Sequence, residues 1–180
     1  MIESSTFTPP QRFGILFQLL LIGVFLAAAA LGLWQAIYTS IGPMLILYLF
    51  PAFLAVFLVP LLTYRIYGLR TAVYSLEREG IHLRWGLRVE DIPIDHILWI
   101  HKKEELESHL HLPWFHWPGS LLGIRRTEGM EEVEFMASRT QGLILIGTPE
   151  RIFAISPANP DLFLHTVSQI MEMGSLAPIP

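Results

Sequence analysis

Two long apolar stretches begin the chain, before any alternation of polar and apolar residues. Residues 13–38 and 43–64 contain no Asp, Glu, Lys or Arg, and the polar turn Thr39-Ser40-Ile41-Gly42 separates them. A helix of about 20 residues crosses the hydrocarbon core of a membrane, so each stretch is long enough to span one. The pattern predicts a transmembrane hairpin, residues 13–64, that follows an N-terminal segment, residues 1–12.

Small residues and prolines inside the stretches indicate how the two helices pack and where they bend. Gly23-x-x-x-Ala27 and Ala28-x-x-x-Gly32 place small residues one turn apart, which allows a second helix to approach closely. Pro51 and Pro60 lie inside the second stretch and are expected to bend it. Neither stretch carries Asp, Glu, Lys, Arg or His, so we do not expect ion transport through it.

Basic residues beside the stretches predict the orientation. Arg12 precedes the first stretch, Arg65 and Arg70 follow the second, and the turn between them has no Lys or Arg. The positive-inside rule then gives a two-pass protein of the inner (plasma) membrane with both ends in the cytoplasm. A cleavable signal peptide is the alternative, because Arg12, the apolar run and residues 27–30 (four Ala) resemble one. The first stretch is long for a signal peptide, and the second follows at once, so we favour the hairpin.

Short apolar and alternating runs dominate after Arg70 and predict antiparallel strands. The expected strands are residues 72–76, 81–85, 87–94, 97–100, 133–136, 143–146 and 152–155. Residues 104–128 lack such a pattern and are expected to be irregular. Gln141-Gly142 and Thr148-Pro149-Glu150 are expected to connect hairpins.

The last predicted element is an amphipathic helix. Asn159 is expected as its N-cap, with Pro160 at the first helical position, and Gly174 ends it before a tail, residues 174–180. The apolar residues expected to lie against the sheet are Leu162, Phe163, Val167 and Ile170.

This order of elements, together with several short motifs, resembles a known family. The motifs are Tyr74-Ser75-Leu76, Gly80-Ile81, Ile92-Pro93-Ile94, Trp117-Pro118-Gly119 with Gly123, Leu143 to Thr148, Ile155-Ser156-Pro157 and Asn159 to Leu164. Residues 71–172 resemble the bacterial pleckstrin-homology-like (PH-like) domains of the membrane-anchored type. The resemblance implies an α+β fold: the transmembrane hairpin, then a PH-like antiparallel β-barrel or sandwich, residues 71–173, capped by a C-terminal helix. It implies a binding or scaffolding module rather than a known reaction.

Composition and charge exclude several classes of function. Only 16% of the 180 residues are charged, against roughly 25% in an average soluble domain. All but one of the 12 Lys and Arg, and all but one of the 16 Asp and Glu, lie in residues 65–180, so that part is acidic and unsuited to nucleic acid. The chain has no cysteine, no Gly-x-Ser-x-Gly elbow and no Gly-rich phosphate loop. Inositide binding is not expected either, because the hairpin Glu77-Arg78-Glu79-Gly80 offers one Arg between two acids.

Histidines in the irregular stretch are a candidate metal site. His109 and His111 would face the same side of a strand, and His116 follows them. Three imidazoles form the ligand set of a catalytic zinc. Their spacing matches no metal motif, and a hydrated loop is the simpler interpretation, so no cofactor is predicted.

Aromatic residues beside these histidines form the preferred contact site. Three large rings within four residues need a partner, which is the domain itself, another protein or the membrane surface. Two basic pairs are either solvated or contact anionic headgroups. The predicted contact residues are Trp114, Phe115, Trp117, Lys102, Lys103, Arg125 and Arg126. We therefore predict a non-catalytic membrane-anchored module, an accessory subunit that contacts lipid through the hairpin and a membrane-protein partner. The alternative is a His-loop metal-binding enzyme or sensor at the membrane surface.

Overall fold

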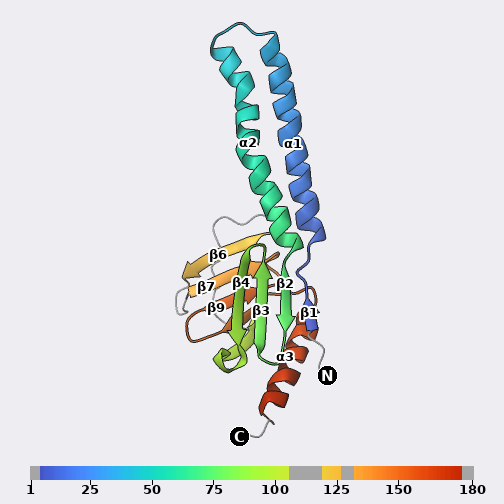
Figure 1. Cartoon of the computed structure of the whole chain (residues 1–180), viewed down its shortest axis with the longest axis vertical. Helices are drawn as coiled ribbons and strands as arrows, with labels where there is room; N and C mark the ends of the chain where they lie inside the picture. Colours follow the sequence, from blue (N-terminus) through green and yellow to red (C-terminus); the bar gives the residue numbers. More distant parts are fainter. Residues whose placement is uncertain (1–4, 106–118, 127–131, 176–180) are drawn as a thin grey trace.

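A helical hairpin projects from a compact β-rich domain (Figure 1). The computed structural model describes residues 5–105, 119–126 and 132–175. Helices α1 (Arg12–Ile37) and α2 (Pro43–Arg70) are both long and apolar enough to cross a membrane. Few of their residues are buried, and their large apolar side chains face outward over most of the length. The two helices are therefore not the core of a soluble domain, and α2 continues six residues beyond the predicted 64.

Small residues mark the crossing of the two helices. Gly32 packs against the backbone of Tyr48, and a Cβ at Gly32 would overlap the Tyr48 carbonyl oxygen. The Ala28-x-x-x-Gly32 motif therefore contributes Gly32 to the interface, whereas a Cβ at Gly23 would have no neighbour within 4 Å. Both prolines lie within the continuous α2 helix.

A short strand that precedes the hairpin joins the domain that follows it. Strand β1 (Ser5–Phe7) pairs antiparallel with β2 (Val73–Leu76), with Thr6 opposite Ser75. The pattern of residues 1–12 predicts no strand, because three residues are too few to show a period. Pairing with β2 fixes both ends of the hairpin to the same sheet edge.

In the described part of the chain, nine strands form two sheets packed as a sandwich. The first sheet has the order β1-β2-β3-β4, and the second has the order β5-β8-β9-β7-β6. The remaining strands are β3 (Gly80–Trp85), β4 (Arg88–Pro93), β5 (Trp99–Lys102), β6 (Leu121–Arg126), β7 (Glu132–Ala137), β8 (Ile144–Gly147) and β9 (Ile152–Ile155). Short 3₁₀ turns occupy Ile94–His96 and Lys103–Glu105. The sheets do not close into a barrel, so the predicted α+β fold is confirmed in its sandwich form.

Three details of the predicted strands and turns are wrong. Strand β6 lies in the stretch that was expected to be irregular, and β7 pairs in parallel with β9 although all pairs were expected to be antiparallel. The Gln141-Gly142 link is not a hairpin, because β9 lies between β7 and β8. Thr148-Pro149-Glu150 does connect the β8–β9 hairpin. Strand order depends on packing between distant segments, which local periodicity does not report.

Helix α3 (Pro160–Ser175) packs on the sandwich and extends away from the hairpin (Figure 1). The side chain of Asn159 accepts a hydrogen bond from the Leu162 amide at 3.2 Å, which confirms the predicted N-cap. Phe163, Val167 and Ile170 are buried, as predicted. Leu162 was expected to be buried and is 52% exposed, because the contact stripe follows i, i+4 and i+7 from Phe163 and leaves its neighbour outside.

The main core lies between the two sheets and under α3. Tyr74 is fully buried there and donates a hydrogen bond from its hydroxyl to the Met136 carbonyl oxygen at 2.7 Å. Burial raises the pKa of the Tyr74 phenol. This bond links the first sheet to the second, since the two residues lie on β2 and β7.

Candidate functional site at the base of the hairpin

The last turns of α2 rest on the turn between β3 and β4. Gly86 in that turn has a φ of 64°, and a Cβ on it would lie 3.3 Å from the Gly68 Cα. The Gly86 amide donates a hydrogen bond to the hydroxyl of Thr71 at 3.1 Å, just after α2 ends. A side chain at Gly86 would strain the backbone and crowd the helix, so this glycine allows the close contact.

The first turn of α1 makes a second close contact with the domain. A Cβ on Gly14 would lie 2.5 Å from the Gly119 Cα and 2.9 Å from a methyl carbon of Leu69. Gly119 has a φ of 83°. Both helices of the hairpin therefore contact the domain through glycine, where the backbones approach one another.

A cavity of about 180 Å³ opens beside this junction. Helix α2, strands β3 and β4 and strands β6 and β7 all contribute to it. Its lining residues are Tyr64, Arg65, Gly68, Trp85, Arg88, Leu122, Gly123, Phe135 and Met136. The two arginines come from α2 and β4, and most of the remaining lining is apolar or aromatic.

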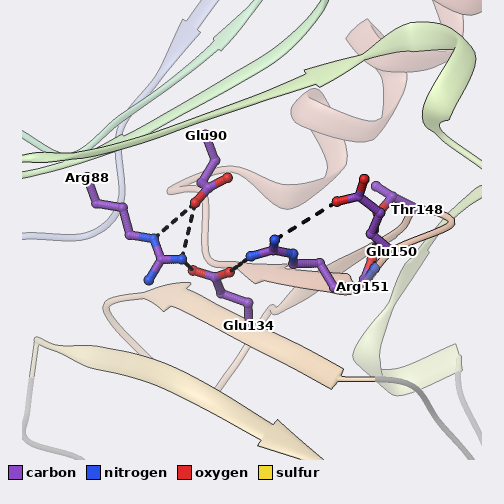
Figure 2. Close-up of polar contacts among 6 residues, drawn as sticks. All are labelled: Arg88, Glu90, Glu134, Thr148, Glu150 and Arg151. Atoms are coloured by element: carbon purple, nitrogen blue, oxygen red, sulfur yellow. Dashed lines mark hydrogen bonds and ion pairs between the residues drawn. The ribbon is translucent and has the colours of Figure 1, made fainter.

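Arg88 of this lining meets a buried carboxylate, that of Glu134 (Figure 2). Glu134 on β7 is 1% exposed, and its two oxygens face two different arginines. Its Oε1 lies 2.5 Å from Nη2 of Arg88, and its Oε2 accepts a hydrogen bond from Nη1 of Arg151 at 2.9 Å. The Arg88 guanidinium also donates to Glu90 at 3.1 and 3.2 Å. A buried carboxylate is costly unless it is paired, and here two cations compensate it.

The strand register explains why these side chains meet. Arg88 and Glu90 are opposite Trp85 and Leu83, which are buried, so they point between the sheets toward Glu134. Arg151 follows the β8–β9 turn, where its backbone bonds with Thr148 fix its position (Figure 2). The hydrogen bond to Glu134 raises the pKa of Arg151. The arrangement holds two carboxylates and two guanidinium groups in place.

Comparison with known families fits this architecture. The family model described as bacterial PH domain matches residues 72–171. The chain belongs to this family. No curated protein and no solved structure matches it. The matched residues run from the start of β2 into α3, so the hairpin and β1 lie outside the PH domain as the family defines it.

The basic pairs predicted as contacts lie far apart on the PH domain. Lys102 ends β5 and Arg125 and Arg126 end β6, and these strands form opposite edges of the second sheet. Lys102 is 2.5 Å from Asp161, which raises the pKa of its ammonium group, and Arg126 is 3.1 Å from Glu132. Lys103 begins the 3₁₀ turn after β5. The four residues therefore do not form one basic surface.

The predicted aromatic and histidine residues lie outside the described residues. They are Trp114, Phe115, Trp117, His109, His111 and His116. Within residues 5–105, 119–126 and 132–175, no three His, Asp or Glu side chains gather as metal ligands would.

Sequence reasoning missed the cavity and the Glu134 cluster. The one local signal is the position of Glu134 in an otherwise apolar strand, Val133 to Ala137, where alternation assigns it to the same face as Met136. Its partners are 46 and 17 positions away in sequence. The packing of the two sheets brings Arg88 to it, and the parallel pairing of β7 with β9 brings Arg151.

Proposed function

We propose that this chain is a membrane-anchored, non-catalytic PH-domain module that serves as an accessory subunit of a membrane-protein complex. It spans the plasma membrane twice, and its PH domain and both chain ends lie in the cytoplasm. The observation that carries the proposal is the pairing of β1 with β2 across the hairpin. The strands on each side of the two apolar helices are joined in one sheet, which supports a topology with both chain ends on one side of the membrane.

The distribution of charge supports the cytoplasmic side. Arg12 begins α1, and Arg65 and Arg70 lie in the last turns of α2, so all three lie at the domain end of the hairpin. The turn between the helices carries no Lys or Arg. The side that retains positive charge is the cytoplasmic side.

The rigid attachment of the PH domain supports a scaffolding role. Contacts at Gly14 and Gly86, together with the β1–β2 pairing, hold the domain in one orientation relative to the hairpin. A domain held in this way presents the same face to any neighbour in the membrane, which lowers the entropy lost on association.

A disulfide across β1 and β2 tests the topology in the full chain, which has no cysteine of its own. Thr6 and Ser75 are opposite each other, and such pairs have Cα atoms about 4.5–5.5 Å apart, within disulfide range. We expect Thr6→Cys/Ser75→Cys to cross-link on mild oxidation of isolated membranes. Thr6→Cys/His82→Cys is the control, because His82 is opposite Ser75 on the next strand and about 10 Å from Thr6.

Failure of the first pair to cross-link, or equal cross-linking of both pairs, would rule out the β1–β2 pairing in the membrane. A reporter fused after Pro180 then fixes the side: cytoplasmic reporter activity agrees with the proposal, and activity outside the cytoplasm contradicts it.

The partner is tested at the predicted aromatic contact. We propose that Trp114 and Trp117 bury their rings against another membrane protein, since large aromatics each bury roughly 150–250 Å² and are enriched in interfaces. The Trp114→Ala/Trp117→Ala variant should lose the proteins that co-purify with the wild type in mild detergent while its thermal midpoint stays unchanged. A large fall in the midpoint with the same proteins retained would mean that the rings pack on the PH domain itself.

A further inference from the structure

The cavity at the base of the hairpin lies at the level expected for lipid headgroups. About 20 residues of α2 cross the hydrocarbon core, so a span that begins at Pro43 leaves the core near Leu62. Tyr64, Arg65 and Gly68 follow directly and line the cavity. This placement rests on the two-span topology proposed above.

Two guanidinium groups from different elements line the same cavity. Arg65 comes from α2 and Arg88 from the start of β4. The carboxylates of Glu90 and Glu134 hold Arg88 in place, as described above, so Arg88 is a fixed donor whose charge is already partly balanced. Arg65 is the second cation of the lining, and guanidinium groups are the preferred partners of phosphate oxygens.

The rest of the lining suits the apolar part of a lipid. Phe135 and Met136 line the cavity and are buried, and Leu122 on β6 is 40% exposed. Gly68 and Gly123 carry no side chains into the space, which helps to keep it open. Tyr64 and Trp85 add rings of the kind that favour the membrane–water boundary.

We propose that this cavity binds the phosphate group of an anionic phospholipid, with Arg65 and Arg88 as its two contacts. The glycerol and the first acyl carbons of the lipid lie against Leu122 and Tyr64. The site differs in position from the β2–β3 hairpin, whose Glu77 and Glu79 repel phosphate. It also differs from Lys102 and Lys103, which belong to the far edge of the second sheet. The proposed lipid would fasten the PH domain to the leaflet in addition to the hairpin.

The test uses the purified full chain in a neutral detergent. Short-chain phosphatidylglycerol, short-chain phosphatidylcholine and inorganic phosphate are each titrated while the thermal midpoint and the bound lipid mass are measured. We expect saturable binding of phosphatidylglycerol, preferred over phosphatidylcholine, and no comparable effect of inorganic phosphate. Loss of one charge-assisted contact in Arg65→Gln should weaken phosphatidylglycerol binding about tenfold.

Matched variants separate the site from general surface charge. Arg70→Gln removes an equal charge from the same last turns of α2, outside the cavity lining, and should bind as the wild type does. Arg65→Lys should recover part of the affinity. Leu122→Trp fills the cavity without a change of charge and should also weaken binding, which keeps the test valid if Arg65→Gln does not fold.

Equal loss in Arg65→Gln and Arg70→Gln would overturn the proposal, as would unchanged binding in both Arg65→Gln and Leu122→Trp. Arg65-dependent binding of inorganic phosphate with the same affinity would identify a soluble phosphate ligand and overturn the lipid assignment. The cysteine cross-link between β1 and β2 reports the topology independently, so failure of the lipid site can be told apart from failure of the proposed function.

Discussion

The buried carboxylate of Glu134 allows a quantitative test of how strongly burial stabilises an ion pair within the second sheet. The perturbation is a double-mutant cycle with Glu134→Gln and Arg151→Met, which removes the charge of each partner singly and together. Glu134→Gln keeps the original side-chain size, and Arg151→Met keeps an unbranched side chain without the guanidinium group. The Nη1–Oε2 distance in the wild type is 2.9 Å.

Burial sets the expected magnitude. Breaking a fully buried ion pair costs about 3–5 kcal/mol, because one charge stays uncompensated in a medium of low dielectric. Glu134 is buried, but Arg151 is 33% exposed, and Arg88 remains as a second partner of Glu134. The expected loss of free energy of unfolding therefore lies below that range. We expect Arg151→Met to lower the free energy of unfolding by about 2 kcal/mol in the wild type. The same change should cost only about 0.5 kcal/mol in the Glu134→Gln background, which gives a coupling of about 1.5 kcal/mol.

Unfolding of the full chain by urea, followed by tryptophan fluorescence in a fixed detergent, measures these free energies. Arg126 and Glu132 form the matched control: they are 3.1 Å apart, but their side chains are 85% and 49% exposed. The corresponding cycle, Arg126→Met with Glu132→Gln, should give a coupling below about 0.5 kcal/mol. A coupling at Glu134 no larger than that of the control would refute the argument that burial gives this ion pair its strength.

Two further predictions concern single residues. Gln18 on α1 is buried, and neither of its side-chain amide atoms has a hydrogen-bond partner in the part of the chain that the structure describes. Because a buried polar group without a partner is costly, Gln18→Leu should raise the free energy of unfolding by about 1–3 kcal/mol. Gln35→Leu, at an exposed position on the same helix, is the control, and a fall in the thermal midpoint of Gln18→Leu alone would mean that the amide is used. A hydrogen bond of 2.6 Å to Asp91 raises the pKa of His82 above its ordinary value of 6.5, so protonated His82 stabilises the fold. This stabilisation, below about 1 kcal/mol for so exposed a pair, is complete below pH 6.5 and is lost as the pH rises through the raised pKa. Unfolding measured across this range should lose that pH dependence in Asp91→Asn, and its persistence would show that another group titrates.

Local pattern determined much of the architecture. The uncharged runs predicted both long helices, because membrane-spanning length and absence of charge are properties of consecutive residues. Asn159 and Pro160 fixed the start of α3, since capping depends on residues next to one another. Alternation found the strands whose inward faces are apolar, such as β3, in which Ile81, Leu83 and Trp85 are buried.

Pattern reasoning failed where an element has no period of its own. Strand β1 is three residues long, and β6 exposes most of its residues, so neither shows the alternation of a half-buried strand. The parallel pairing of β7 with β9 follows from the order of strands in the sheet, which links residues such as Val133 and Ile152. Each of these features is stabilised by a segment that is distant in sequence, and the segment itself carries no sign of its partner.

The candidate site depends on tertiary structure in the same way. The sequence determined that two apolar helices with flanking arginines precede a strand-rich domain, because charge and apolar length are read directly from consecutive residues. The PH domain was expected from the resemblance of its short motifs to the bacterial family. It did not determine that Arg65 and Arg88 line one cavity, or that Glu134 is buried between Arg88 and Arg151. Those relations exist only after α2 has packed on the domain, β7 has paired with β9 and the two sheets have packed together, because folding alone brings side chains from separate elements close to one another.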